Sequence, residues 1–220
     1  MASHLDLEEQ EQLAELKHFW KTYGNLISWL LILVLGSYAA WNGWQYWERN
    51  QAAKASALYD EVEKSVLSLD VTRVERSMAD MKDKFGSTQY AHQAALLSAR
   101  VLAEKGKPDQ ARALLAWSAE KAPNAAWRDL ARIRLAAFQW ESQSVDEALK
   151  TLQADVVAEM APLAADLKGD LLLAKGQSTE AVAAYRIALK GLNEGDEYRR
   201  IVQAKLTVLG VDSQAKEGGQ

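Results

Sequence analysis

Residues 165–185 read ADLKGDLLLAKGQSTEAVAAY, two apolar helical segments joined by a short turn. Gly169 lies where the first helix must be small, and Gly176 lies in the turn, where it lets the backbone reverse. Ala181 and Tyr185 follow on the second segment at helical spacing. This pattern predicts two helices that pack closely against each other.

The same turn occurs three times along the chain. Residues 106–111, 143–148 and 176–181 align, and the alanines that end them are 37 and then 33 residues apart. A period of about 34 residues with paired helices is typical of tetratricopeptide repeats. The middle segment lacks the turn glycine and carries three extra residues, so an ordinary alanine-rich helical bundle stays open as the alternative. We predict an all-α fold with a tetratricopeptide-like helical-repeat (α-solenoid) domain over residues 48–212.

An uncharged segment precedes this domain. No residue from Thr22 to Trp47 is charged, a run of 26 residues. A helix needs about 20 apolar residues to cross a bilayer. Trp20 and Trp44 lie near the two ends of this run, and indole rings favour the interface between membrane and water. We expect residues 22–47 to form a transmembrane helix in a lipid bilayer.

Residues 1–21 form a short acidic tail, with five acidic side chains against Lys17 and Lys21. Cleaved signal peptides begin with a basic region, so this tail favours an uncleaved anchor. Charge alone does not set the orientation, because two basic residues precede the span and three follow it within about 20 residues. The small and polar residues 213–220 predict a disordered tail.

Composition excludes several classes of site. The 220 residues include no Cys, and this excludes disulfides, thiolate metal sites and Cys nucleophiles. The three His leave little room for a His-rich metal site. The net charge of −4 gives no basic footprint for nucleic-acid binding. No phosphate-binding glycine loop, H-E-x-x-H or G-x-S-x-G pattern is present in the sequence. We expect no catalytic residues, no cofactor and no metal, with an envelope enzyme of unrecognised chemistry as the alternative.

Helical-repeat domains bind partners on their concave surface. The alignment of the repeats brings Arg100, Trp140, Asp166 and Asp170 to the inner face of the leading helices. We expect a groove there that holds an extended segment or a partner helix, with Trp140 as an apolar anchor. The alternative is that Trp140 belongs to ordinary packing between repeats.

The predicted membrane helix offers a second contact surface. Gly36 and Ala40 are four residues apart, as are Ala39 and Gly43. Small residues at that spacing let two membrane helices approach closely. We therefore expect a lateral contact with another membrane helix along this stripe.

The chain resembles the YfgM-type ancillary Sec-translocon subunits of proteobacteria. The resemblance lies in Gly43-Trp-Gln-Tyr-Trp47, in residues 165–176, and in the order of acidic tail, membrane helix and repeat domain. It implies an inner-membrane protein with a cytoplasmic amino terminus and a periplasmic carboxyl domain. It also implies association with the SecYEG channel and with a membrane-anchored, PpiD-like periplasmic chaperone, and it carries over no catalytic residue.

The sequence leads to the hypothesis of a non-enzymatic, single-span adaptor. It would gather a chaperone or emerging, unfolded secreted polypeptides beside the translocon and would act by raising their local concentration. Two alternatives stay open. One is an assembly factor for another envelope complex, such as one that matures cytochromes, and the other is a regulator that acts through its cytosolic tail.

Overall fold

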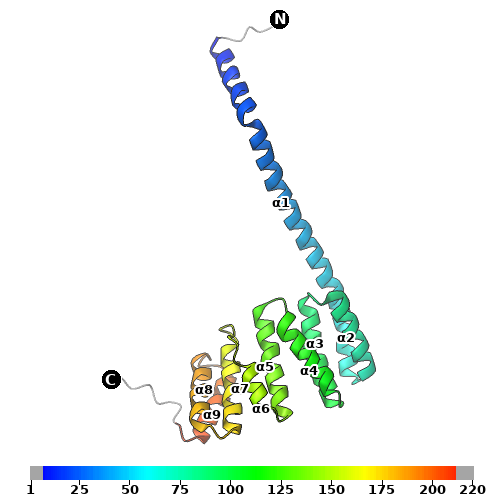
Figure 1. Cartoon of the computed structure of the whole chain (residues 1–220), viewed down its shortest axis with the longest axis vertical. Coiled ribbons are helices and arrows are strands. Elements are labelled where there is room, and N and C mark those ends of the chain that lie inside the picture. Colours follow the sequence, from blue (N-terminus) through cyan, green and yellow to red (C-terminus); the bar gives the residue numbers. More distant parts are fainter. Residues whose placement is uncertain (1–6, 212–220) are drawn as a thin grey trace, which may run out of the picture. The chain divides into compact units, whose positions relative to one another are not determined.

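The computed structural model describes residues 7–211, and every regular element among them is an α-helix (Figure 1). The nine helices of this range are α1 (Leu7–Leu67), α2 (Val71–Phe85), α3 (Gln89–Glu104), α4 (Pro108–Lys121), α5 (Ala125–Glu141), α6 (Val145–Thr151), α7 (Ala161–Ala174), α8 (Ser178–Lys190) and α9 (Glu197–Val208). The prediction of an all-α fold is therefore confirmed. The predicted disordered tail at residues 213–220 lies outside the described residues, as do the first six residues of the acidic tail.

Helix α1 contributes to two compact units, which divide between Gln51 and Ala52. In the first unit the helix is long and apolar enough to cross a membrane, by length and composition. Only 6% of its most apolar window is buried, so it is not the core helix of a soluble fold. Aromatic rings pair near both ends of the apolar stretch, Phe19 with Tyr23 at 5.1 Å and Trp44 with Trp47 at 5.5 Å.

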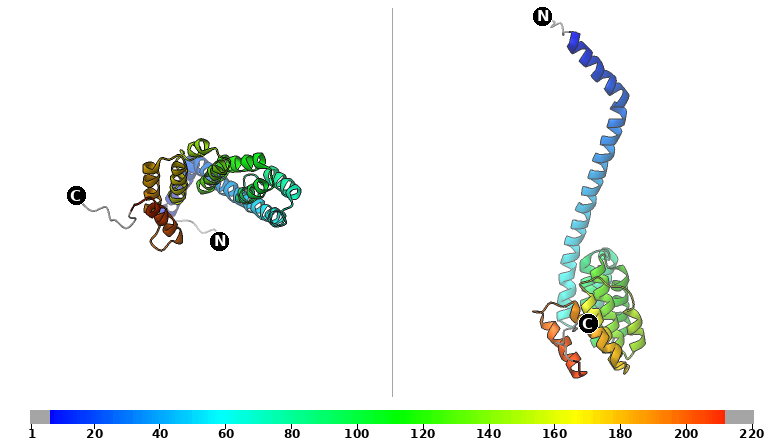
Figure 2. Two further views of the ribbon diagram at one scale, coloured as in Figure 1. Left: turned by 90° about the horizontal axis from the view of Figure 1, so that it is seen from below. Right: turned by 90° about the vertical axis from the view of Figure 1, so that its left-hand side faces the viewer.

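The second unit is a stack of helices that follow one another in chain order (Figures 1 and 2). From α2 onward each helix contacts the next one along the chain. In addition α3 contacts α5 and α5 contacts α7, so alternate helices line the same side. The end of α1 joins this stack through Ala55 and Val62, which share a core with Met78 and Met81 of α2.

A residue in the left-handed conformation, with positive φ, follows every second helix. The N–H of the residue after it donates to the carbonyl five positions earlier, as from Lys107 to Leu102 at 2.8 Å. This bond closes the helix end, where carbonyl groups otherwise lack partners. The residues with positive φ are spaced by 37, 37, 33 and 34 positions, and they are Leu69, Gly106, Gln143, Gly176 and Gly210.

These turns show that the repeat extends beyond the three segments that the sequence aligned. The end of α1, and then α3, α5, α7 and α9, are the leading helices; α2, α4, α6 and α8 are the trailing helices. In the middle pair Gln143 takes the left-handed conformation (φ 62°) that Gly106 and Gly176 take in the others. The missing turn glycine therefore does not remove that pair from the repeat.

Candidate functional site

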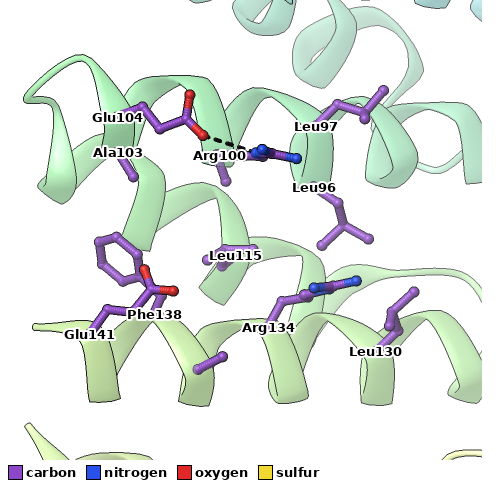
Figure 3. Close-up of a pocket in the computed structure, with 12 residues that line it drawn as sticks. Leu96, Leu97, Arg100, Ala103, Glu104, Leu115, Leu130, Arg134, Phe138 and Glu141 are labelled. Atoms are coloured by element: carbon purple, nitrogen blue, oxygen red, sulfur yellow. Dashed lines mark hydrogen bonds and ion pairs between the residues drawn. The ribbon is translucent and has the colours of Figure 1, made fainter. Parts of the chain in front are cut away.

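A cavity of about 610 Å³ lies between the leading helices α3 and α5 (Figure 3). Its floor includes Leu115 of the trailing helix α4. Leu115 belongs to a core cluster that also holds Ala99 and Leu102 of α3, so the cavity rests on rigid packing. A concave space between adjacent helices, with apolar walls and a few polar groups, is the usual form of a binding site.

Helical spacing decides which side chains reach the cavity. On α5 these include Leu130, Arg134, Ala137 and Glu141, at intervals of four, three and four residues. Such intervals place side chains on one face of a helix. On α3 the face includes Leu96, Arg100 and Glu104, again at intervals of four, and residue 97 beside them.

The side chains of the two walls follow the same order along the cavity: leucine, arginine, glutamate. Figure 3 shows leucines at one end of the cavity, an arginine from each wall in the middle, and a glutamate from each wall at the other end. The arginines are Arg100 and Arg134, and the glutamates are Glu104 and Glu141. The cavity therefore has an apolar zone of leucines, a positive zone, and a negative zone that also holds the ring of Phe138.

The four charges differ in how they are used. The Nε of Arg100 donates to Oε1 of Glu104 at 2.9 Å, in an exposed pair on α3. Within the part of the chain that the structure describes, Arg134 and Glu141 have no hydrogen bond and no ion pair. The exposed Arg134 and Glu141 are thus the two charged groups of the cavity that are free to meet a ligand.

Of the four residues that the sequence analysis proposed for a groove, Arg100 lines the cavity. Trp140 lies on α5 one position before Glu141 and is 36% exposed, but it does not line the cavity. One residue along a helix turns the side chain by about 100°, which moves Trp140 to the neighbouring face. The alignment from turn to turn did not detect Arg134.

Asp166 and Asp170 of α7 lie elsewhere, in a polar cluster with helix α9. The Nζ of Lys205 donates to Oδ2 of Asp166 and to Oδ2 of Asp170, each at 2.8 Å. The hydroxyl of Tyr198 donates to Asp166 at 2.6 Å, and that of Tyr185 donates to Asp170 at 2.8 Å. Both carboxylates therefore bind groups of their own chain and serve to hold α9 on α7.

The same cluster perturbs its tyrosines. Burial raises the pKa of Tyr185 and Tyr198 well above the ordinary value, and the hydrogen bonds to Asp170 and Asp166 raise it further. Loss of a proton from either hydroxyl would place a third negative charge beside two carboxylates. These tyrosines therefore remain neutral hydrogen-bond donors at physiological pH.

The small residues of α1 remain open in the first unit. An added Cβ at Gly36 or Gly43 would meet nothing within 4 Å. Ala39 and Ala40 are likewise exposed. The stripe has room for a second helix, and its use as a contact stays a prediction.

His92 of α3 is held by structural contacts. Among residues 7–211, no group of three His, Asp or Glu side chains is arranged to hold a metal ion. His92 of α3 is fully buried and stacks on Trp117 of α4 with ring centroids 4.3 Å apart. Its Nε2 lies 3.1 Å from the Gly86 carbonyl and its Nδ1 lies 3.2 Å from Oγ of Ser118. Burial lowers the pKa of His92, which keeps the ring neutral.

The chain is similar in sequence to known proteins over most of its length. A family model described as a tetratricopeptide repeat-like domain matches residues 17–211, which end directly after the last left-handed turn. An ancillary SecYEG translocon subunit of Neisseria gonorrhoeae is 30% identical over 210 residues, 95% of this chain and 100% of that protein. The chain belongs to this family of ancillary SecYEG translocon subunits. The tetratricopeptide-like fold and the resemblance stated from the sequence are thereby confirmed.

Other members of the family agree. The ancillary SecYEG translocon subunit of Haemophilus influenzae is 29% identical over 182 residues, 83% of this chain and 89% of that protein. That of Escherichia coli is 26% identical over 185 residues, 83% of this chain and 87% of that protein. Family membership and the exposed apolar stretch of α1 together indicate a membrane-anchored protein.

Proposed function

We propose that the protein is a non-enzymatic, membrane-anchored adaptor of the Sec translocon. The observation that carries this proposal is the match along 95% of the chain to a relative named as an ancillary SecYEG translocon subunit. The match covers 100% of that relative, so the anchor and the repeat domain are both included. Two alternatives from the sequence, an assembly factor for another envelope complex and a tail-based regulator, have no such support.

The proposed division of labour follows the chain. Residues 1–21 form a cytoplasmic tail, residues 22–47 cross the inner membrane once, and residues 48–212 form a periplasmic repeat domain. The small-residue stripe through Gly36 and Ala40 offers a lateral surface for a membrane helix of SecYEG. Within the repeat domain, the cavity between α3 and α5 is the binding site for a partner.

The mechanism is proximity rather than chemistry. A membrane anchor confines the repeat domain to a thin layer beside the channel exit. Partners held there, a PpiD-like periplasmic chaperone or an emerging unfolded polypeptide, reach a high effective concentration without any new reaction. Repeat domains suit this task because their extended concave surface can contact a chain segment along its length.

Affinity purification from membranes tests the proposal. The full chain is tagged and extracted in mild detergent, beside a variant whose residues 22–47 are replaced by an unrelated membrane helix of equal length. We expect the unmodified chain to recover SecYEG and a periplasmic chaperone, and the helix-exchanged chain to lose much of its SecYEG. Recovery of a different envelope complex in place of SecYEG would refute the translocon role and support the assembly-factor alternative.

A further inference from the structure

We infer that the cavity between α3 and α5 selects an extended polypeptide segment that carries an apolar, an acidic and a basic side chain in that order, in either direction of its chain. This inference rests on the proposed adaptor function and specifies the segment that the same site binds. It follows from three features of the cavity: the order of its side chains, the two charged side chains that have no partner among residues 7–211, and the two helix ends that lie at one side.

The order of side chains is fixed along α5. Leu130 lies four residues before Arg134, and Glu141 lies seven residues after Arg134. At about 1.5 Å per residue, these steps are roughly 6 Å and roughly 10 Å along the helix axis. The opposite wall on α3 repeats the order from the leucines to Arg100 to Glu104 (Figure 3).

The charges without partners determine which ligand groups fit. Since Arg100 and Glu104 satisfy each other, Arg134 and Glu141 remain to be matched by a ligand. Arg134 matches a carboxylate, for which its planar guanidinium is well shaped. Glu141 matches an ammonium or guanidinium group, and the apolar zone beside Leu130 takes an aliphatic or aromatic side chain.

The helix ends strengthen the negative zone. Glu104 is the last residue of α3, and Glu141 is the last residue of α5. The carboxyl end of a helix carries a partial negative charge from its aligned peptide dipoles. Two such ends and two carboxylates at one side of the cavity favour a cation there and disfavour an anion.

The spacing of the ligand follows from that of the wall. An extended chain advances about 3.3 Å per residue and its side chains alternate between two faces, so roughly 6 Å corresponds to two residues on one face. The next side chain on that face lies two residues further, and the length of a Lys or Arg side chain covers the rest of the roughly 10 Å to Glu141. The preferred segment therefore reads apolar-x-acidic-x-basic. The acidic group is a side-chain carboxylate inside the segment, since the segment continues past it to the basic group.

Peptide binding to the full chain in lipid nanodiscs tests the inference. Fluorescent peptides with blocked ends carry Leu-Gly-Asp-Gly-Lys or the charge-exchanged Leu-Gly-Lys-Gly-Asp, flanked by Gly and Ser. Anisotropy should show that the first peptide binds roughly fivefold more tightly than the second, as expected for two exposed charge pairs. Equal affinities, the reverse preference, or no saturable binding of either peptide would overturn the inference.

A charge-exchanged protein supplies the reciprocal test. The double variant Arg134→Glu/Glu141→Arg should prefer the second peptide over the first. The matched control is Asp80→Lys/Lys84→Asp, which exchanges an exposed ion pair on α2 and should keep the preference of the unmodified chain. A double variant that keeps the unmodified preference would show that these two charges do not read the segment.

Failure of the inference and failure of the proposed function give different results. If the chain recovers SecYEG but does not discriminate between the peptides, the adaptor role stands and the inference is wrong. If it discriminates between the peptides but recovers no SecYEG, the cavity has the stated specificity and the adaptor role is wrong.

Discussion

The ring of Tyr185 on α8 occupies the space that a side chain at Gly169 on α7 would need. An added Cβ at Gly169 would lie 2.6 Å from Cδ1 and 2.9 Å from Cζ of that ring. Tyr185 cannot easily move away, because it is fully buried and its hydroxyl donates to Asp170. The absence of a side chain at residue 169 is therefore a condition for this helix pair.

The first prediction concerns Gly169→Ala. Overpacking against a fixed ring costs about 1–3 kcal/mol, so the midpoint of thermal unfolding should fall by roughly 2–10 °C. The control is Gly195→Ala, where an added Cβ meets nothing within 4 Å and the backbone has no positive φ. Circular dichroism of the two variants measures the difference. Equal midpoints for the two would contradict the packing described.

The second prediction concerns the cluster that holds α9. Lys205→Met removes the ammonium shared by Asp166 and Asp170, and Asp166 is only 4% exposed. Leaving a buried carboxylate without its cation should lower the free energy of unfolding by about 3 kcal/mol. Lys84→Met breaks an exposed pair with Asp80 and should cost about 1 kcal/mol or less. Denaturant unfolding measures both values, and a similar small loss in both would contradict a structural role for the cluster.

The third prediction concerns pH. His92 has a lowered pKa in the folded state, so unfolding takes up a proton as the pH falls below about 6.5. The stability that neutral His92 supports is present above that pH and is lost as the pH falls, by up to about 1.4 kcal/mol per pH unit. Burial is the larger effect on this pKa, and the hydrogen bond to the Gly86 carbonyl acts in the opposite direction.

The measurement is the unfolding midpoint between pH 7.5 and pH 5. The unmodified chain should lose stability relative to His92→Gln, which keeps hydrogen-bonding groups but does not titrate. His18→Gln changes an exposed ring of α1 and should follow the unmodified chain. Parallel curves for the unmodified chain and His92→Gln would show that His92 does not couple to folding.

The fourth prediction concerns orientation. The sequence contains no Cys, so one introduced Cys is the only thiol in the chain. In intact cells, a membrane-impermeant maleimide should label Ser178→Cys in the repeat domain. It should label Gln12→Cys, before the apolar stretch, only after the cells are broken. The opposite pattern would place the repeat domain in the cytoplasm and refute the proposed topology.

Much of the fold follows from local sequence signals. Gly106 and Gly176 predict turns with positive φ, because glycine adopts positive φ without strain. Gln143 and Leu69 take the same conformation without that signal, since the stack and the helix-closing hydrogen bonds compensate for a disfavoured backbone. Gly210 is a glycine at the repeat spacing, 34 residues after Gly176, and it also adopts positive φ.

The residues that line the cavity were harder to predict from the sequence. Aligning the repeats by their turns selected Arg100, which lines the cavity, and Trp140, which does not, and it did not select Arg134 on α5. The two helices line the cavity from opposite sides, so equivalent positions of the repeat do not both face it: Ala103 of α3 does, and Trp140, at the same distance from its turn, does not. Asp166 and Asp170 match the pattern of a binding surface, yet Lys205, 35 or more residues away, takes both. Whether these carboxylates face a ligand or an internal cation depends on how α9 packs against α7, which the sequence pattern does not show.

Photocrosslinking in the intact membrane tests the central claim most directly. A photoreactive side chain is placed at Ala40 in the small-residue stripe, at Arg134 in the cavity, and at Ile187 on α8 as an exposed control. We predict SecYEG adducts from Ala40, adducts with a periplasmic chaperone or a secreted polypeptide from Arg134, and neither from Ile187. Adducts from Ala40 with another envelope complex alone, and the same adducts from Arg134 as from Ile187, would contradict the account.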